Sequence, residues 1–218
     1  MKTATGSPYV SKPVTDLKDK VVLITGAGRG SGRALAEAFA ERGACIAAND
    51  ISPVNLDEVV NGILKQGGRS RAYIEDVVKK VGAQHIVKQV EDDFGRIDIL
   101  INHAAVEPHI PLLDMDEWDW HRVLDVNLTG AFLMTQSVGR VMRAQGQGVI
   151  INLISRTKAP PGSDAAAFIA SMSGLAGLTQ QAESELRPYG IQVYSVEIEA
   201  DQVVGRVLAL LAERKDEP

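Results

Sequence analysis

The chain has 218 residues and a single cysteine, Cys45. One cysteine excludes a disulfide framework within the chain and a cysteine-based metal site. Its place in an apolar run favours a small buried side chain. The histidines are too scattered along the sequence to predict a metal site, and they are His85, His103, His109 and His121. We therefore expect no metal.

The sequence also lacks long apolar runs and blocks of basic residues. No apolar run approaches the roughly 18 residues of a membrane span, and the N-terminus lacks the apolar core of a signal peptide. The net charge is −5, so nucleic acid and anionic membranes are poor candidate partners. Hydrophobic residues make up 45% and charged residues 23%, which is typical of a globular protein with a full core. These features predict a cytoplasmic protein.

The length suits one domain. Residues 1–17 contain Thr, Ser, Gly and two prolines, and they predict a polar N-terminal tail. Residues 18–218 show no internal repeat and no interior linker. We expect them to form the single folded domain.

The segment Lys20–Gly32 carries the strongest pattern. A β-branched run leads directly into a glycine cluster, and residues 33–42 predict a helix. A strand, a tight glycine turn and a helix N-terminus allow the backbone to approach a diphosphate closely. Asp50 ends the next apolar run, which is where the dinucleotide-binding pattern has an acidic residue. The segment therefore predicts a dinucleotide site.

Strands and helices alternate along the remaining chain. Further strands are predicted at 44–50, 69–74, 97–102, 149–154 and 191–196, and further helices at 55–66, 78–94, 116–143, 164–187 and 201–212. This alternation predicts an α/β fold of the Rossmann type, with a doubly wound parallel sheet in three α/β/α layers. A ligand is expected beyond the carboxyl ends of the strands, where the strand order reverses.

Several motifs resemble those of the short-chain dehydrogenase/reductase family, over about residues 18–196. Five features of the family have counterparts in this sequence. They are the glycine motif T-G-x-x-x-G-x-G, the acid before the third helix, the N-N-A-G turn, the N-x-x-G-x-F helix motif and the fifth-strand serine. In order, these counterparts are Thr25, Gly26, Gly30 and Gly32; Asp76; Asn102-His103-Ala104-Ala105; Asn127, Gly130 and Phe132; and Ser155.

The resemblance implies a bound dinucleotide and the residues that hold it. They are Thr25, Gly26, Arg29, Gly30, Ser31, Gly32, Asp50, Asp76, Val77, Asn102 and Ala104. A carboxylate at position 50 can bond the ribose hydroxyls of NAD and would repel the 2′-phosphate of NADP. Arg29 resembles the basic residue of some NADP-using members. NAD is therefore the expected cofactor, and NADP is the less favoured one.

The sequence departs from the family at the residues that move a proton. The family's catalytic tyrosine and lysine correspond to Phe168 and Met172, and no shift of register restores them. Phenylalanine has no proton to donate, and methionine has neither charge nor donor. Ser155 and Asn127 remain as the other two members of the catalytic set. Lys158 follows the fifth strand and is interpreted as a surface charge.

The C-terminal part departs as well. The family's sixth strand leads into a Pro-Gly turn and a substrate lid, and a final strand follows. Here the strand leads into Glu197-Ile198-Glu199-Ala200-Asp201 and then into the last helix. We therefore expect a sheet without the last strand and lid, with an open edge at 191–196.

Three functional hypotheses follow. The first is a member that binds NAD(H) and has lost or greatly weakened hydride transfer between carbonyl and alcohol. The second is an active NAD(P)-dependent dehydrogenase that uses Ser155 with a non-standard acid or base, such as His109, or whose site is completed by a second chain. His103, like His109, lies near the expected substrate position and can in principle supply a proton. The third is a non-enzymatic partner subunit that uses the sheet edge and the two long helices. Since family members commonly pair those helices, we expect a homo-oligomer, a dimer or a tetramer.

Overall fold

The computed structural model describes residues 17–155, 164–198 and 202–213. Within them, six parallel strands form one sheet in the order β3-β2-β1-β4-β5-β6. The strands are β1 Val21–Thr25, β2 Cys45–Asp50, β3 Arg69–Ile74, β4 Ile99–Asn102, β5 Gly148–Ser155 and β6 Ile191–Ile198. The predicted doubly wound α/β fold is confirmed.

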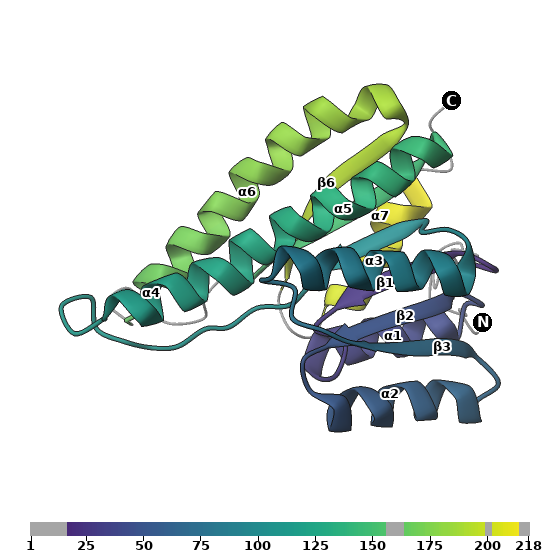
Figure 1. The fold of residues 1–218 in the computed structure, drawn as a ribbon, viewed down its shortest axis with the longest axis horizontal. Helices are drawn as coiled ribbons and strands as arrows, with labels where there is room; N and C mark the ends of the chain where they lie inside the picture. Colours follow the sequence, from purple (N-terminus) through teal and green to yellow (C-terminus); the bar gives the residue numbers. More distant parts are fainter. Residues whose placement is uncertain (1–16, 156–163, 199–201, 214–218) are drawn as a thin grey trace, which may run out of the picture.

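The described residues form seven α-helices, and six of them cover the two faces of this sheet (Figure 1). The seven helices are α1 Gly30–Ala40, α2 Pro53–Lys65, α3 Lys80–Phe94, α4 Glu117–Leu124, α5 Gly130–Gln145, α6 Ala166–Leu186 and α7 Val203–Glu213. Helices α1, α2 and α7 pack on one face, and α3, α5 and α6 pack on the other. None of the described helices is long and apolar enough to cross a membrane.

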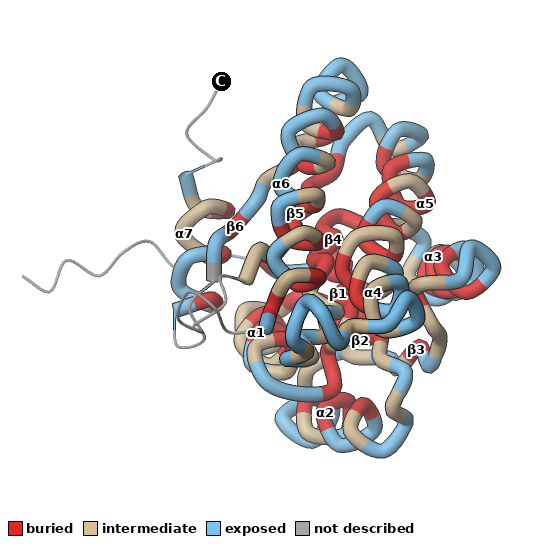
Figure 2. Tube along the Cα trace, turned by 90° about the vertical axis from the view of Figure 1, so that its left-hand side faces the viewer, coloured by how far each residue is buried: buried red, intermediate tan, exposed pale blue. Residues whose placement is uncertain are grey.

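Burial on both faces explains the apolar strand sequences. In β1, Val22 and Ile24 contact one helix layer, and Val21 and Leu23 contact the other. A strand covered on both sides has no solvent face, so its residues are apolar throughout instead of alternating. The central strands are accordingly buried along much of their length, and the exposed residues lie mainly on the helices, the turns and the outer strand β3 (Figure 2). Cys45 is one of the buried residues, as predicted.

The strand order reverses between β1 and β4. From β1 the chain builds β2 and β3 on one side, and then it crosses to build β4, β5 and β6 on the other. The turns that leave β1 and β4 therefore diverge and open a crevice at the carboxyl edge of the sheet. This is the edge at which the sequence predicts a ligand.

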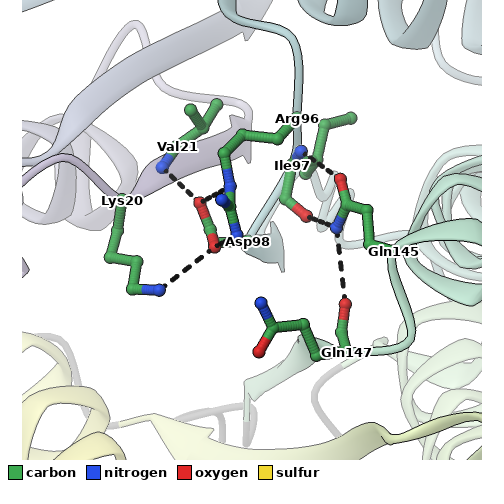
Figure 3. A network of polar contacts seen from close by, with 7 residues as sticks. All are labelled: Lys20, Val21, Arg96, Ile97, Asp98, Gln145 and Gln147. Carbon is green, nitrogen blue, oxygen red and sulfur yellow. Dashed lines mark hydrogen bonds and ion pairs between the residues drawn. The ribbon is translucent and has the colours of Figure 1, made fainter.

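At the amino ends of β1 and β4, opposite the crevice, polar contacts around Asp98 hold the strands together (Figure 3). This buried carboxylate accepts a hydrogen bond from the Val21 backbone at 3.0 Å, and it pairs with Arg96 and Lys20. The Gln145 side chain bonds both the N–H and the C=O of Ile97, as a neighbouring strand would. These contacts tie β1, β4 and α5 together away from the crevice.

The helix predicted at 116–143 is not uniform. Residues Asp125–Thr129 form a π-helical turn between α4 and α5. Asn127 lies in this turn, and its side chain bonds both backbone groups of Val106 in the loop after β4. The periodicity of apolar residues does not reveal such a turn, because the helix continues on both sides of it. Leu17, which we assigned to the tail, is buried against the core.

Candidate functional site

A cavity of about 810 Å³ lies at the carboxyl edge of the sheet. The turns after β1 and β4, the end of β2, the connection from β3 to α3 and one side of α4 form its walls. Of the predicted site residues, it is lined by Gly26, Arg29, Asp50, Asp76, Val77 and Ala104. The fold thus brings together residues that are far apart in the sequence.

The glycine turn after β1 requires the absence of side chains at several points. Gly26 has φ +67°, a conformation that favours glycine. A Cβ at Gly32 would lie 2.2 Å from the carbonyl oxygen of Gly26. Gly30 has φ +55°, and a Cβ there would meet no atom within 4 Å. Open space therefore adjoins the N-terminus of α1, where backbone N–H groups and the helix dipole favour an anion. Ser31 lies in this first turn.

Thr25 joins the turns that leave β1 and β4. Its hydroxyl oxygen accepts hydrogen bonds from the backbone N–H of His103 at 3.1 Å and of Ala104 at 3.2 Å. The threonine is buried, so these bonds are not exchanged with water. Thr25 fixes the width of the crevice between the two turns and is not itself in the cavity lining.

Asp50 and Asn49 position the far side of the cavity. The Asp50 carboxylate accepts from the backbone N–H of Gly28 and of Ser52, each at 3.0 Å. The buried Asn49 amide donates to the carbonyl oxygens of Tyr73 and Glu75. These two bonds from Asn49 fix the position of the connection between β3 and α3, which contains Asp76 and Val77. Asn49 was not predicted as a site residue, since its role depends on the pairing of β2 with β3.

His103 lies against the glycine turn. Its Nδ1 is 3.1 Å from the carbonyl oxygen of Gly26, and His103 is one of the residues that line the cavity. Burial lowers the pKa of His103 below the ordinary value, and hydrogen bonds to backbone groups oppose this shift without cancelling it. The ring is therefore neutral at pH 7. Because a carbonyl oxygen only accepts, Nδ1 carries the hydrogen.

Asn102 and Asn127 are buried and lie outside the cavity lining. The Asn102 amide donates to Asn152 at 2.8 Å and to Thr135 at 3.2 Å, which links β4 with β5 and α5. The Asn127 amide donates to Ser171 of α6 at 3.0 Å in addition to its bonds to Val106. In this structure both asparagines connect elements of the fold.

Phe168 and Met172 are packed into an apolar cluster. Their exposed fractions are 2% and 5%, and they lie with Val123, Ala131 and Leu175 between α4, α5 and α6. Ser155 ends β5 and is partly exposed. None of Phe168, Met172 and Ser155 lines the cavity described above. Lys158 lies outside the described residues.

The other histidines are dispersed. His85 lies 2.6 Å from Glu75, and His121 lies 3.4 Å from Glu117. His109 is exposed in the loop after β4. Among the described residues, no group of three or more His, Cys, Asp or Glu side chains is arranged to hold a metal ion.

One wall of the cavity was missed by the sequence motifs. Trp118, His121, Arg122 and Asp125 of α4 and the following turn line it at helical spacing. The Arg122 guanidinium lies 5.5 Å from the centre of the Trp118 ring. The spacing alone marks one side of a helix, but only the tertiary structure shows that this side faces the crevice.

The parallel sheet, its topological switch point and the glycine turn define a Rossmann-type protein with a nucleotide-binding crevice. The family model for short chain dehydrogenases matches residues 20–200. The chain therefore belongs to the short-chain dehydrogenase/reductase family, whose members are oxidoreductases that bind NAD(P).

Relatives and solved structures agree with this assignment. An uncharacterized oxidoreductase of Thermotoga maritima is 38% identical over 181 residues, which is 83% of this chain and 71% of the relative. D-threitol dehydrogenase of Mycolicibacterium smegmatis is 34% identical, over 83% of this chain and 69% of its own. NAD⁺-bound xylitol dehydrogenase is similar, with a TM-score of 0.80 and 34% identity over 84% of this chain and 71% of that one. A metagenomic short-chain oxidoreductase in complex with NADP has a TM-score of 0.84 and 32% identity over 91% and 92% of the two chains.

Proposed function

We propose that the protein binds NAD(H) in this cavity and has lost, or retains only weakly, hydride transfer between carbonyl and alcohol. The buried apolar pair Phe168 and Met172, at the positions of the family's tyrosine and lysine, is the observation that carries this proposal. The two halves of the proposal rest on different residues, so each has its own test.

The described residues fit a dinucleotide. The open space beside Gly30 at the N-terminus of α1 suits the diphosphate, and the neighbouring Arg29, which lines the cavity, adds a positive charge. Asp76 and Val77 line the part assigned to the adenine. The Asp50 carboxylate suits the ribose hydroxyls of NAD, which favours NAD over NADP. The bound cofactor would supply or accept the hydride.

The side chains of Phe168 and Met172 have no proton to donate. A family member of this type needs an acid near the reacting oxygen, and such help is worth roughly 10² to 10⁴ in rate. The cluster that holds the pair is made of apolar side chains from α4, α5 and α6. Ser155 alone can donate a hydrogen bond to a carbonyl, but an unassisted hydroxyl is a poor proton donor.

The double variant Phe168→Tyr/Met172→Lys tests the catalytic half. We expect the wild type to show no NAD-linked turnover of a carbonyl and alcohol panel above the cofactor-only blank. The double variant should gain at least about 10²-fold over that level. The matched control is Ile169→Tyr/Ser173→Lys, which places the same residues one position along on the exposed side of α6. It should gain nothing.

Wild-type turnover would overturn the loss of activity, and Ser155→Ala would then show whether that serine carries it. Circular dichroism should accompany the double variant, because Met172→Lys places a charge in an apolar cluster. Calorimetry of the wild type with NAD and NADH tests the binding half. No binding at millimolar ligand would overturn it, whatever the activity assays give.

A groove between α5 and α6 supports a homo-oligomer. It has a volume of about 340 Å³, and its lining includes Phe132, Leu178 and Tyr189. Phe132 is 42% exposed and Tyr189 45%, so the groove presents two large aromatic side chains to solvent. We propose that the same two helices of a second copy cover this groove.

Light scattering of the wild type should therefore give a dimer or a tetramer. Phe132→Arg should shift the mass toward the monomer, and Leu64→Arg on α2, also exposed, should leave it unchanged. A wild-type monomer at high concentration would overturn the proposal. An oligomer that binds no NAD would instead favour a partner subunit without enzymatic function.

A further inference from the structure

His103 stands where the family turn has its second asparagine, and it brings a titratable group into the cavity. The ring lies between the two turns that form the crevice. Its Nδ1 is 3.1 Å from the Gly26 carbonyl oxygen, and an ideal Cβ at Gly32 would lie 2.7 Å from the same nitrogen. The ring is thus packed against the segment on which a diphosphate would rest.

The hydrogen bond to Gly26 fixes the tautomer. Since Nδ1 donates to a carbonyl, Nε2 of the neutral ring has a free lone pair and no hydrogen. An anionic oxygen would be repelled by this lone pair and attracted by a protonated Nε2. An asparagine at this position cannot take up a proton when an anion binds, because its amide stays neutral at the pH values at which histidine titrates.

The charges that act on His103 come from the turn before α1 and from the end of β2. Arg29 disfavours the protonated ring, and Asp50 favours it. Burial is the largest influence, and it holds the pKa of His103 below the ordinary value in the free protein. An anion beside the ring would oppose both the burial and Arg29.

We propose that dinucleotide binding draws one proton from solvent onto Nε2 of His103, so that a neutral imidazole becomes an imidazolium that faces the diphosphate. The inference rests on the proposed function, because it concerns the same cavity. His103 is then a positioning residue with two bonds: Nδ1–H holds the glycine turn, and Nε2–H holds the ligand.

The consequence is a pH-dependent affinity. Between the pKa of the free protein and the higher pKa of the complex, binding takes up a proton, so affinity falls as pH rises. One proton gives at most a tenfold change per pH unit. Above the pKa of the complex both states are neutral at His103, and the affinity becomes independent of this group.

Isothermal calorimetry with NAD tests the inference, in pairs of buffers that differ in ionisation enthalpy, between about pH 5 and pH 8. The wild type should take up a fraction of a proton approaching one, with dissociation constants that rise with pH. His103→Asn should bind NAD with no uptake and a flat pH profile. Adenosine, which has no diphosphate, should bind the wild type without uptake.

His85→Asn provides the control, since His85 is exposed, is not in the cavity lining and contacts the cavity wall only through Glu75. It should keep the wild-type uptake. NAD binding without proton uptake, or equal uptake by wild type and His103→Asn, would overturn the inference and leave the binding proposal intact. Absence of NAD binding at every pH would overturn both.

Discussion

The backbone N–H of Gly28 donates a hydrogen bond to Oδ2 of Asp50 over 3.0 Å. The acid at the end of β2 thus supports the glycine turn after β1, and the same side chain lines the cavity. Charge and hydrogen-bond acceptance are therefore combined in one carboxylate. Asparagine separates them in part: it loses the charge and keeps one acceptor oxygen, which can serve the N–H of Gly28 or of Ser52 but not both.

Asp50→Asn should relax the discrimination against NADP at the cost of one of the two backbone hydrogen bonds, those from Gly28 and Ser52, that the carboxylate accepts. Removing the charge removes the repulsion of a 2′-phosphate, and we expect the ratio of NADP to NAD affinity to rise at least about tenfold, or 1.4 kcal/mol. Calorimetry with both dinucleotides measures this ratio. Asp50→Ala is the comparison variant, and it should lose more stability, because the N–H groups of Gly28 and Ser52 both lose their acceptor. If the ratio of NADP to NAD affinity is unchanged in Asp50→Asn, Asp50 does not determine which dinucleotide is bound.

The predicted fold and the predicted crevice rested on patterns that are local in sequence. The β-branched run at 20–24, the glycines that follow it and Asp50 each mark an element or its end, and the doubly wound topology then places them at one edge. What local patterns do not contain is the partner of a side chain. The bonds from Asn49 to the carbonyls of Tyr73 and Glu75 exist only because β2 pairs with β3.

Thr25→Val should destabilise the protein by about 1–3 kcal/mol. The change keeps the shape of the side chain and removes the acceptor of two backbone N–H groups, those of His103 and Ala104, in a buried position. Urea unfolding measures the loss. Thr129→Val is the control, because the Thr129 hydroxyl makes one exposed contact of 3.5 Å to Asp125, and it should change stability by less than about 0.5 kcal/mol. Equal losses in the two variants would contradict the role given to Thr25.

Asp98→Ala should cost about 1–3 kcal/mol without altering NAD affinity. It leaves the buried Val21 N–H without its acceptor and separates Arg96 and Lys20 from their partner at the edge of the sheet opposite the cavity. Urea unfolding gives the loss, and calorimetry gives the affinity. Asp92→Ala serves as the control: its side chain is 60% exposed and pairs with Lys88, so the change should be within about 0.5 kcal/mol. A weakened NAD affinity in Asp98→Ala would show that the two edges are coupled.

The π-helical turn at Asp125–Thr129 marks the limit of periodicity as a predictor. Asn127 was found by its motif, yet its side chain reaches Val106 and Ser171, on a loop and a helix that are distant in sequence. The same holds for α4, whose Trp118 side lines the cavity. Helical spacing identifies the residues that share one side, and packing decides what that side faces.

The stability of the protein without ligand should fall as pH is lowered through about 6.5, with a contribution from His103. The pKa of His103 is lowered by burial in the folded protein and is ordinary, near 6.5, in the unfolded chain. Below about pH 6.5 the unfolded chain therefore binds more protons, and the free energy of unfolding drops by up to about 1.4 kcal/mol per pH unit until the folded-state pKa is reached. Urea unfolding of wild type and His103→Asn at a series of pH values measures this, because the carboxylates common to both cancel in the difference. The free energy of unfolding of the wild type minus that of His103→Asn should be constant above about pH 7 and should decrease below it, because only the wild type loses the contribution of His103. If the two free energies of unfolding instead change in parallel with pH, His103 is not buried as a neutral ring.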